Sequence, residues 1–309
     1  MNKIFITRQL MPIAKELLSA HFEVEENPLD QPLSREKLKR VVREFDGILS
    51  TIPDRLDREV LEQATRLKVI SNCAAGLDNV DTAVAKGRKI AVFNVPDATT
   101  ESTADMTFAI LLSLIRRVGE AESYVKRGLW KGWEPALLLG EELFGKYFGI
   151  IGFGKIGKAV AQRALGFGMK VLVFARSKLD LADPRIEQVS LDELYQKSHF
   201  LSLHVPLTTE TQGMIDKAAF QKMAQKPVII NMSRGAVIRT DDLVEALKEG
   251  AVRGAALDVT DPEPILPTHP LCHLKNCLIV PHIGSATAEC RTLLARKAAE
   301  NLIRFFHDQ

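Results

Sequence analysis

The chain has 309 residues, more than a single hydrophobic core usually holds, so one large or two medium-sized domains are expected. Hydrophobic residues make up 46% and charged residues 26%, as in ordinary globular proteins, and the formal net charge is only +2. No block of like charges stands out, which argues against nucleic acid or a membrane as the main partner.

The N-terminal segment up to Pro12 has only a short apolar stretch and an early arginine, Arg8, so it predicts a first strand and no signal peptide. No apolar run reaches the roughly 18 residues that a membrane helix needs, so a cytoplasmic protein is expected. The cysteines form no Cys-x-x-Cys pair, which predicts reduced, structural thiols and no metal site. A zinc site is the alternative, but no His/Cys cluster has ligand spacing. The four cysteines are Cys73, Cys272, Cys277 and Cys290.

The N-terminal third alternates between short apolar runs and helical spacing. Strands are predicted at residues 3–7, 46–51, 68–72 and 91–95, and helices at 11–22 and 57–67. This alternation is typical of βαβ units and a parallel sheet.

Residues 102–118 form a long, nearly all-round apolar helical pattern, with Ser102 and Asp105 resembling a capping signal at its start. Such a helix is usually buried between two layers or two domains. A second series of apolar runs follows, and residues 286–306 form an amphipathic helix. We therefore expect an α/β protein with a substrate-binding domain of residues 1–98 plus 284–309, and a dinucleotide-binding domain of residues 99–283.

A glycine loop follows the predicted strand Tyr147–Ile151 and leads into a helical pattern. Gly-x-Gly-x-x-Gly alone is a weak signal, but its position between a strand and a helix favours a dinucleotide site over a turn without ligand. The first glycine permits the tight turn, the second lets the backbone approach a pyrophosphate, and the third lets helix and strand pack closely. The residues of the loop are Gly152, Phe153, Gly154, Lys155, Ile156 and Gly157.

The strand after this helix ends in Arg176, Ser177 and Lys178, about 20 residues beyond the glycines. NAD-preferring sites usually place an acid there to bind the ribose 2′-hydroxyl. Two cations flanking a hydroxyl suit a 2′-phosphate instead, so NADPH is predicted over NADH. The alternative is a solvated basic loop in a protein that binds NAD.

Three chemically active residues follow later predicted strands, where ligands gather in open α/β sheets. Arg234 offers a guanidinium fork to hold a carboxylate and polarise a carbonyl. His282 can give a proton to a forming alkoxide, and Glu263 can stabilise and orient the protonated ring. Together they predict reduction of a 2-keto acid, although each alone could be a surface ion-pair member, a loop acid or a structural histidine.

Six ordered motifs resemble the D-2-hydroxyacid dehydrogenase family over essentially the whole chain, closest to its glyoxylate/hydroxypyruvate reductase branch. The motifs are NCAAGLDNVD, GIIGFGKIG, HVPLTTET, NMSRGAVI, LDVTDPEP and PHIGSAT. The resemblance implies two doubly wound parallel-sheet domains, Rossmann- or flavodoxin-like, with an interdomain cleft, a homodimer formed largely through the cofactor domain, and Arg234, Glu263 and His282 at the catalytic positions.

The resemblance also implies that backbone N–H groups of Ala75, Gly76 and Leu77 bind the substrate carboxylate, together with Arg234 and His282. It implies that Trp133, in the segment WKGWEP, closes the substrate pocket of the partner subunit, whereas the alternative is a buried core tryptophan. Asp258 would bond the nicotinamide amide. Other residues implied to line the cofactor site are Thr107, Val205, Pro206, Met232, Ser233 and Gly284.

Departures from related branches narrow the substrate. Asn72 stands where phosphoglycerate dehydrogenases of the family place an arginine, so a phosphorylated substrate is not expected. Pro281 precedes His282 where formate dehydrogenases carry glutamine. Two alternatives stay open: a broader D-2-hydroxyacid dehydrogenase acting on a bulkier keto acid, and a dinucleotide-binding scaffold that resembles transcriptional corepressors of the family.

Overall fold

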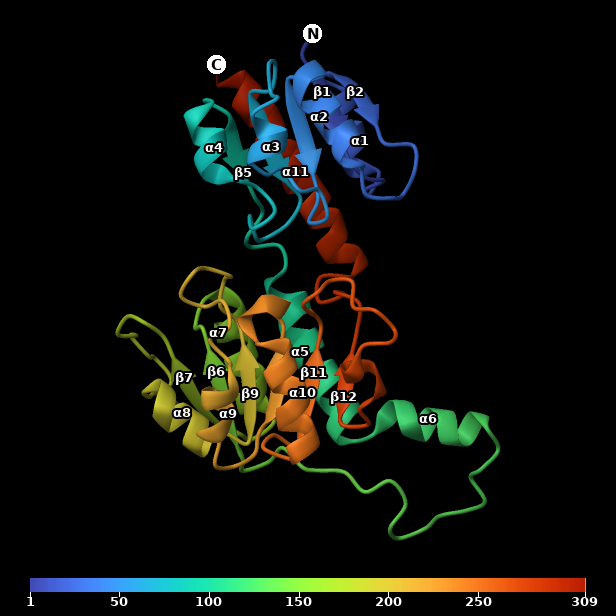
Figure 1. Ribbon diagram of the computed structural model, residues 1–309, viewed down its shortest axis with the longest axis vertical. Coiled ribbons are helices and arrows are strands. Elements are labelled where there is room, and N and C mark those ends of the chain that lie inside the picture. Colours follow the sequence, from blue (N-terminus) through green and yellow to red (C-terminus); the bar gives the residue numbers. More distant parts are fainter. Residues whose placement is uncertain (309) are drawn as a thin grey trace. The chain divides into compact units, whose positions relative to one another are not determined.

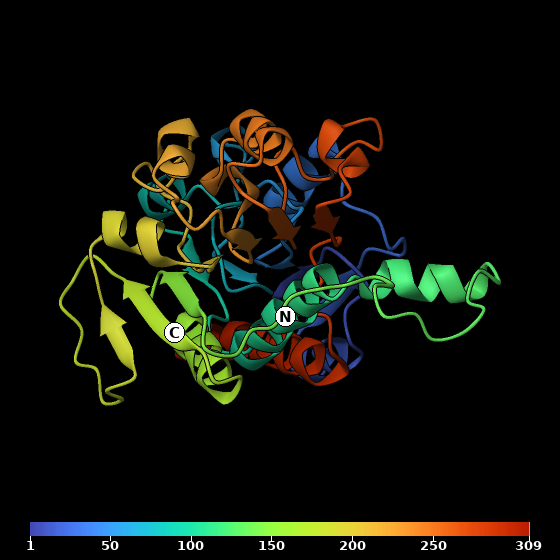
Figure 2. The same cartoon turned by 90° about the horizontal axis from the view of Figure 1, so that it is seen from below.

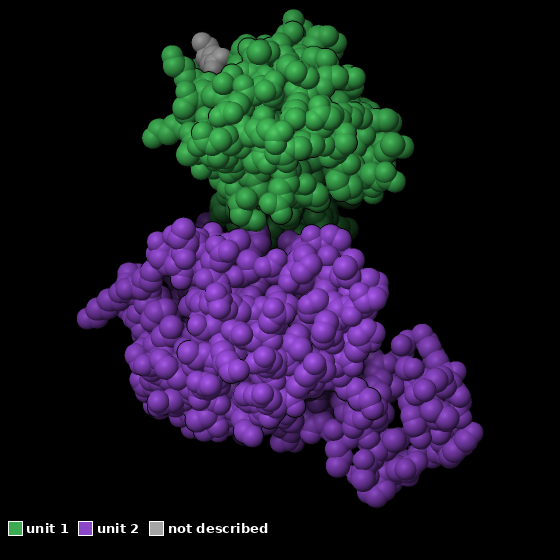
Figure 3. Space-filling view, viewed as in Figure 1, with its two compact units in different colours: residues 1–99, 285–309 green, residues 100–284 purple. Residues whose placement is uncertain are grey.

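The computed structural model describes residues 1–308 and divides the chain into two compact units (Figure 3). Unit 1 contains Met1–Thr99 and Ser285–Gln309, and unit 2 contains Thr100–Gly284. Unit 1 is therefore built from both ends of the chain, and unit 2 is a single continuous segment.

Unit 1 contains a five-stranded parallel sheet with strand order β2-β1-β3-β4-β5 (Figure 1). This is the flavodoxin-like order, in which the chain winds outwards from β1 in both directions. The strands are β1 (Lys3–Ile6), β2 (Glu23–Glu26), β3 (Gly47–Ser50), β4 (Val69–Asn72) and β5 (Ala91–Phe93).

Helices cover both faces of this sheet because successive strand residues point to opposite sides. Ile4 and Ile6 pack in one core with α1 and α11, and Phe5 packs in the other with α2, α3 and α4. The sheet is thus buried on both faces, as parallel sheets are. The helices are α1 (Ile13–Ser19), α2 (Arg35–Glu44), α3 (Arg58–Leu61), α4 (Thr82–Gly87) and α11 (Ala288–His307).

Unit 2 contains a seven-stranded parallel sheet with order β12-β11-β10-β9-β6-β7-β8. The chain runs from β6 to β7 and β8 on one side, then crosses to β9 on the other, which is the Rossmann pattern. The strands are β6 (Tyr147–Ile151), β7 (Lys170–Phe174), β8 (Ile186–Gln188), β9 (Phe200–Leu203), β10 (Val228–Asn231), β11 (Gly254–Leu257) and β12 (Cys277–Ile279).

Two helix layers cover this second sheet. Phe108 of α5 and Val160 of α7 pack in one core, and Leu194 of α8, Phe220 of α9 and Leu243 of α10 pack in the other. Helix α6 is different: it has no buried residue, and with its following loop it projects from the body of unit 2 in both views (Figures 1 and 2). The helices are α5 (Thr100–Ile115), α6 (Val118–Lys126), α7 (Lys155–Gly166), α8 (Leu191–Lys197), α9 (Lys217–Gln221) and α10 (Thr240–Glu249), with short 3₁₀ turns η1 (Gly235–Val237) and η2 (Pro270–His273).

The prediction of two doubly wound parallel-sheet domains is confirmed, but two local predictions are wrong. The helix expected at residues 57–67 is only the single turn α3, because the N–H groups of Gln63 and Ala64 bond three residues back and the Arg88 guanidinium takes the Ala64 carbonyl. The cap expected at Ser102 lies inside α5, which begins at Thr100.

The sequence pattern did not show strand β2 because EVEE contains one apolar residue and lies at the edge of the sheet. A membrane-spanning helix is not found among the described residues, since none of their helices is both long and apolar enough.

Candidate active site

The glycine loop lies at the point where the strand order of unit 2 reverses, because β6 has β7 on one side and β9 on the other. Ligands of open α/β sheets bind beyond the carboxyl ends of strands at this point. Gly152 ends β6 with a left-handed φ of +94°, and a Cβ there would lie 2.5 Å from the His204 carbonyl oxygen. Only glycine fits this turn.

The loop forms a cradle that suits a pyrophosphate. Gly154 is the N-cap of the twelve-residue helix α7 and supplies no side-chain cap, so no capping side chain covers the start of this helix, where a phosphate would bind. A Cβ at Gly154 would meet no atom within 4 Å, whereas one at Gly157 would lie 2.2 Å from the Gly152 carbonyl oxygen. The second glycine therefore faces open space and the third packs helix against strand, as a dinucleotide requires.

The basic segment after β7 is exposed. Arg176, Ser177 and Lys178 all reach solvent, and Gln188 holds the segment by donating to the Ser177 carbonyl oxygen at 2.8 Å. Glu210, in the loop after β9, has its pKa lowered mainly by the Thr208 hydroxyl and in part by Arg176. The positive charge of Arg176 thus acts on the loop that also contains Val205 and Pro206.

His282 and Glu263 form the pair that the sequence predicts. The His282 Nδ1 atom lies 2.6 Å from Glu263 Oε1, and the side chains are 24% and 39% exposed. Because Nδ1 is bonded to the carboxylate, Nε2 is the ring nitrogen left to exchange a proton. The carboxylate thus orients an imidazole that reaches solvent.

Asp258 anchors the segment that contains His282. Its two carboxylate oxygens accept the N–H groups of Ile283 at 2.6 Å and Gly284 at 2.9 Å, and its carbonyl accepts the His282 N–H at 2.9 Å. Burial raises the pKa of the Asp258 carboxyl, although these two N–H groups oppose the rise. His282 has a left-handed φ of +52°. The bonds from Asp258 to the N–H groups of His282 and Ile283 hold its backbone in this conformation.

Arg234 lies on a loop that packs tightly against the one containing Glu263. A Cβ at Gly235 would lie 2.0 Å from the backbone of Thr260, so the two loops touch backbone to backbone. The Arg234 carbonyl accepts the Asn231 side-chain amide at 2.9 Å, and the guanidinium donates to the Ser233 carbonyl at 2.8 Å. The arrangement places a guanidinium and the His282–Glu263 pair beyond the ends of adjacent strands of one sheet.

Residues 108–284 match the family described as "D-isomer specific 2-hydroxyacid dehydrogenase, NAD binding domain". The chain belongs to this dehydrogenase family. The matched segment lies in unit 2, so this unit carries the NAD-binding domain of the enzyme.

Whole-chain relatives agree with the family. A glyoxylate reductase of Thermococcus litoralis is 44% identical, the match covering 98% of this chain and 93% of that protein. The crystal structure of the TT0316 protein from Thermus thermophilus has a TM-score of 0.92 at 41% identity and covers 99% of this chain and 97% of that one. A D-lactate dehydrogenase from Aquifex aeolicus, crystallised with NAD and lactic acid, has a TM-score of 0.87 at 29% identity over 99% and 96% of the two chains.

The other residues predicted to line the cofactor site all lie in unit 2. Thr107 is fully buried and its hydroxyl donates to the Thr103 carbonyl within α5. Met232 and Gly284 pack against each other beside Asp258, since a Cβ at Gly284 would lie 3.1 Å from the Met232 methyl. Val205 and Pro206 follow β9, and Ser233 donates to the Asn231 side-chain oxygen.

In unit 1, the loop Ala75–Leu77 follows β4 and is partly exposed, whereas the four residues before it are buried. Trp133 lies in the segment after α6 and is 85% exposed, so the alternative of a buried core tryptophan is wrong.

Two residues near the predicted site, Asn231 and His204, open the motifs NMSRGAVI and HVPLTTET, but the sequence assigned them no role. Asn231 bonds both Ser233 and the Arg234 carbonyl from the end of β10. His204 has its Nε2 2.8 Å from Ser202 Oγ, and burial lowers its pKa to about 3. Each directly follows an apolar strand residue. The prediction of Arg234 likewise used its place after a strand.

Proposed function

We propose that the protein is an NADPH-preferring reductase that converts a small 2-keto acid, glyoxylate or hydroxypyruvate, to its D-2-hydroxy acid. The observation that supports this most directly is the 2.6 Å contact between His282 Nδ1 and Glu263 Oε1, which leaves Nε2 as the proton donor. A carboxylate-oriented imidazole on a dinucleotide-binding sheet suits reduction of a carbonyl.

The residues have separate tasks in this reaction. When bound, the nicotinamide supplies the hydride that adds to C2 of the keto acid. His282 gives a proton to the carbonyl oxygen as its charge develops, and Glu263 stabilises the charged ring before transfer. Arg234 is assigned to carboxylate binding and carbonyl polarisation in unit 2, and the backbone N–H groups at Ala75–Leu77 are assigned to carboxylate binding in unit 1. In the oxidative direction the neutral His282 takes the proton back.

Preference for NADPH is inferred from Arg176, Ser177 and Lys178. All are exposed at the end of β7, and none is an acid that would repel a 2′-phosphate. A guanidinium clamps phosphate in two hydrogen bonds, so Arg176 is the residue assigned to the discrimination.

The test is a steady-state assay of NADPH and NADH against glyoxylate, hydroxypyruvate, pyruvate and phenylpyruvate. We expect the highest kcat/KM with NADPH and either glyoxylate or hydroxypyruvate. Highest turnover of phenylpyruvate would support the bulkier-substrate dehydrogenase instead. Tight NADPH binding without turnover of any keto acid would support the scaffold.

We also propose a homodimer in which α6 and the segment after it contact a second copy. Apolar side chains on this arm are exposed, including Val125 at 53%, Trp130 at 59% and Trp133 at 85%. Solvent-exposed clusters of this kind mark protein interfaces.

In light scattering, the wild type should have twice the monomer mass and Val125→Asp should be monomeric. Trp133→Ala should stay dimeric with a raised KM for the keto acid; an unchanged KM would remove Trp133 from the pocket.

A further inference from the structure

Two successive carbonyl groups in the loop after β4 are each bonded by a side-chain amide. Asn94 Nδ2 donates to the Ala75 carbonyl at 2.6 Å, and Asn72 Nδ2 donates to the Gly76 carbonyl at 2.9 Å. Both donors come from within unit 1: Asn72 ends β4 and Asn94 follows β5. The loop is therefore held from its inner side by two neutral amides.

Peptide geometry gives this arrangement a direction. In a trans peptide the carbonyl of one residue and the N–H of the next point in opposite directions. Fixing the carbonyls of Ala75 and Gly76 inwards therefore turns the N–H groups of Gly76 and Leu77 outwards. Among residues 1–308, neither N–H donates to another protein group, and both residues reach solvent. Adjacent N–H groups facing one way make an anion-binding concavity.

Asn72 is itself held rigidly. It is fully buried, its Oδ1 accepts the Ser50 hydroxyl at 2.9 Å, and its Nδ2 also bonds Asn79 Oδ1 at 3.0 Å. Such an amide has no freedom to release the Gly76 carbonyl without leaving a buried polar group unpaired.

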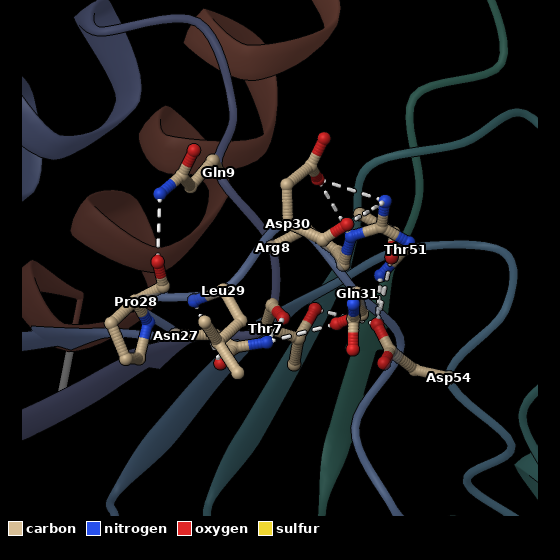
Figure 4. Close-up of polar contacts among 10 residues, drawn as sticks. All are labelled: Thr7, Arg8, Gln9, Asn27, Pro28, Leu29, Asp30, Gln31, Thr51 and Asp54. Carbon is tan, nitrogen blue, oxygen red and sulfur yellow. Dashed lines mark hydrogen bonds and ion pairs between the residues drawn. The ribbon is translucent and has the colours of Figure 1, made fainter.

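Asn79 extends the network to the turn after β3. Its Nδ2 donates to the carbonyls of Thr51 and Asp54, each at 3.0 Å. The Asp54 carboxylate in turn accepts the Thr51 N–H at 2.7 Å and the Thr7 hydroxyl at 2.5 Å (Figure 4). The loop after β4 is thereby tied to the ends of β3 and β1.

We infer that Asn72 and Asn94 are positioning residues that aim the Gly76 and Leu77 N–H groups at the substrate carboxylate. The inference rests on the proposed function, because it assumes that a 2-keto acid is the ligand of this loop. Neither asparagine touches the reacting atoms; each acts through a backbone carbonyl. Two fixed N–H donors would bind a carboxylate placed directly on the reacting carbon, the group that all 2-keto acids share.

The experiment compares Asn72→Ala and Asn94→Ala with Asn27→Ala as a matched control. Asn27 is also a buried asparagine of unit 1 whose Nδ2 donates to two carbonyls, of Thr7 and Gln31, each at 3.0 Å (Figure 4). It follows β2, and its side chain bonds Thr7, Gln31, Leu29 and Lys37, none of which lies in the loop after β4. Asn27→Ala therefore measures how the loss of a buried amide changes stability, separately from any effect on the loop after β4.

Three properties are measured: the steady-state kinetics for glyoxylate, which give KM and kcat, the inhibition constant of oxalate with NADPH present, and the Kd of NADPH by fluorescence. Each test variant should raise the glyoxylate KM and the oxalate constant roughly tenfold, with a smaller change in kcat and an unchanged NADPH Kd. Asn27→Ala should lower the melting temperature but leave all three within about twofold.

The outcomes separate the inference from the function on which it rests. A wild type that reduces glyoxylate, with Asn72→Ala and Asn94→Ala retaining its KM and oxalate constant, overturns the inference alone. A tenfold rise in Asn27→Ala also overturns it, since any lost amide would then act alike. A wild type that binds NADPH yet neither reduces a keto acid nor binds oxalate overturns the proposed function. If Asn72→Ala does not fold, the result for Asn94→Ala decides the test, because Asn94 is the more exposed of the two.

Discussion

The two units use the same architecture to present different chemistry at their strand ends. In unit 2 the groups beyond the strands are charged side chains, and Glu263 and His282 are bonded to each other at 2.6 Å. In unit 1 they are neutral amides, Asn72 and Asn94, which hold backbone carbonyls and leave backbone N–H groups outward. A parallel doubly wound sheet gathers loops at one edge, and the residues in those loops decide whether side chains or peptide dipoles meet the ligand.

The largest effect is expected from removing the proposed proton donor of unit 2, His282. His282→Ala should lower kcat by about 10²–10⁴-fold, because general acid catalysis contributes that much, while the NADPH Kd stays near the wild-type value. Stopped-flow single-turnover reduction of glyoxylate measures the chemical step directly. The control His273→Ala removes an exposed histidine elsewhere in unit 2 and should leave the rate unchanged. Near wild-type turnover in His282→Ala would refute the assigned role.

A smaller effect is expected from the cofactor side of unit 2. Arg176→Ala should reduce kcat/KM for NADPH roughly 10–100-fold through loss of charge-assisted bonds to phosphate, with little change for NADH. Arg185→Ala is the matched control, since Arg185 is an exposed arginine of the same connection paired with Asp183. Equal losses with both cofactors would reject the assignment of Arg176.

The backbone contact between the Arg234 and Glu263 loops predicts a stability effect. Gly235→Ala places a Cβ 2.0 Å from Thr260 backbone atoms and should destabilise the protein by about 1–3 kcal/mol, with a fall in kcat as the loops separate. Urea unfolding followed by circular dichroism measures the first effect. Gly166→Ala, whose Cβ meets no atom within 4 Å, should be neutral. Equal stability of the two variants would show that the loops separate freely.

The smallest predicted effect lies in unit 1 and depends on pH. Burial disfavours the charge of Asp46, but bonds from Arg66 and the Lys3 N–H outweigh it and keep the Asp46 pKa below its usual value. The stabilisation is therefore complete above about pH 4 and disappears as pH falls through the folded-state pKa. Asp46→Asn should lower the unfolding free energy by about 1 kcal/mol at pH 7, with the difference shrinking below pH 4. A difference independent of pH would contradict this.

Sequence patterns predicted the buried strands and the charged groups after them, because both signals are local. Apolar runs show the sheet, and a strand followed by Gly-x-Gly-x-x-Gly shows the turn at Gly152. The edge strand β2 was missed because only Val24 of its four residues is apolar. The helix expected at residues 57–67 ended early because Arg88, distant in sequence, bonds the Ala64 carbonyl.

The amide network of unit 1 illustrates what local patterns do not show. Asn72 opens the motif NCAAGLDNVD and was otherwise noted only for replacing an arginine, and its bonds join Ser50 of β3 to Gly76 and Asn79 of the loop after β4. A neutral side chain that acts through another residue's backbone has no signature of charge or spacing. Its function is apparent only when the donors and acceptors are located in space.

Unit 1 is assembled from the first and last segments of the chain, and this has a consequence for synthesis. Helix α11 supplies Leu294, Ala298 and Leu302 to one of its two cores, and the Ala298 carbonyl accepts the Ser71 hydroxyl. On the ribosome, residues 1–99 must therefore wait through translation of all of unit 2 with this core only partly covered, by α1 alone. A continuous unit 2 is free to fold first, since domains generally fold as they emerge. The newborn protein would thus complete its dinucleotide domain before its first hundred residues acquire their final partner.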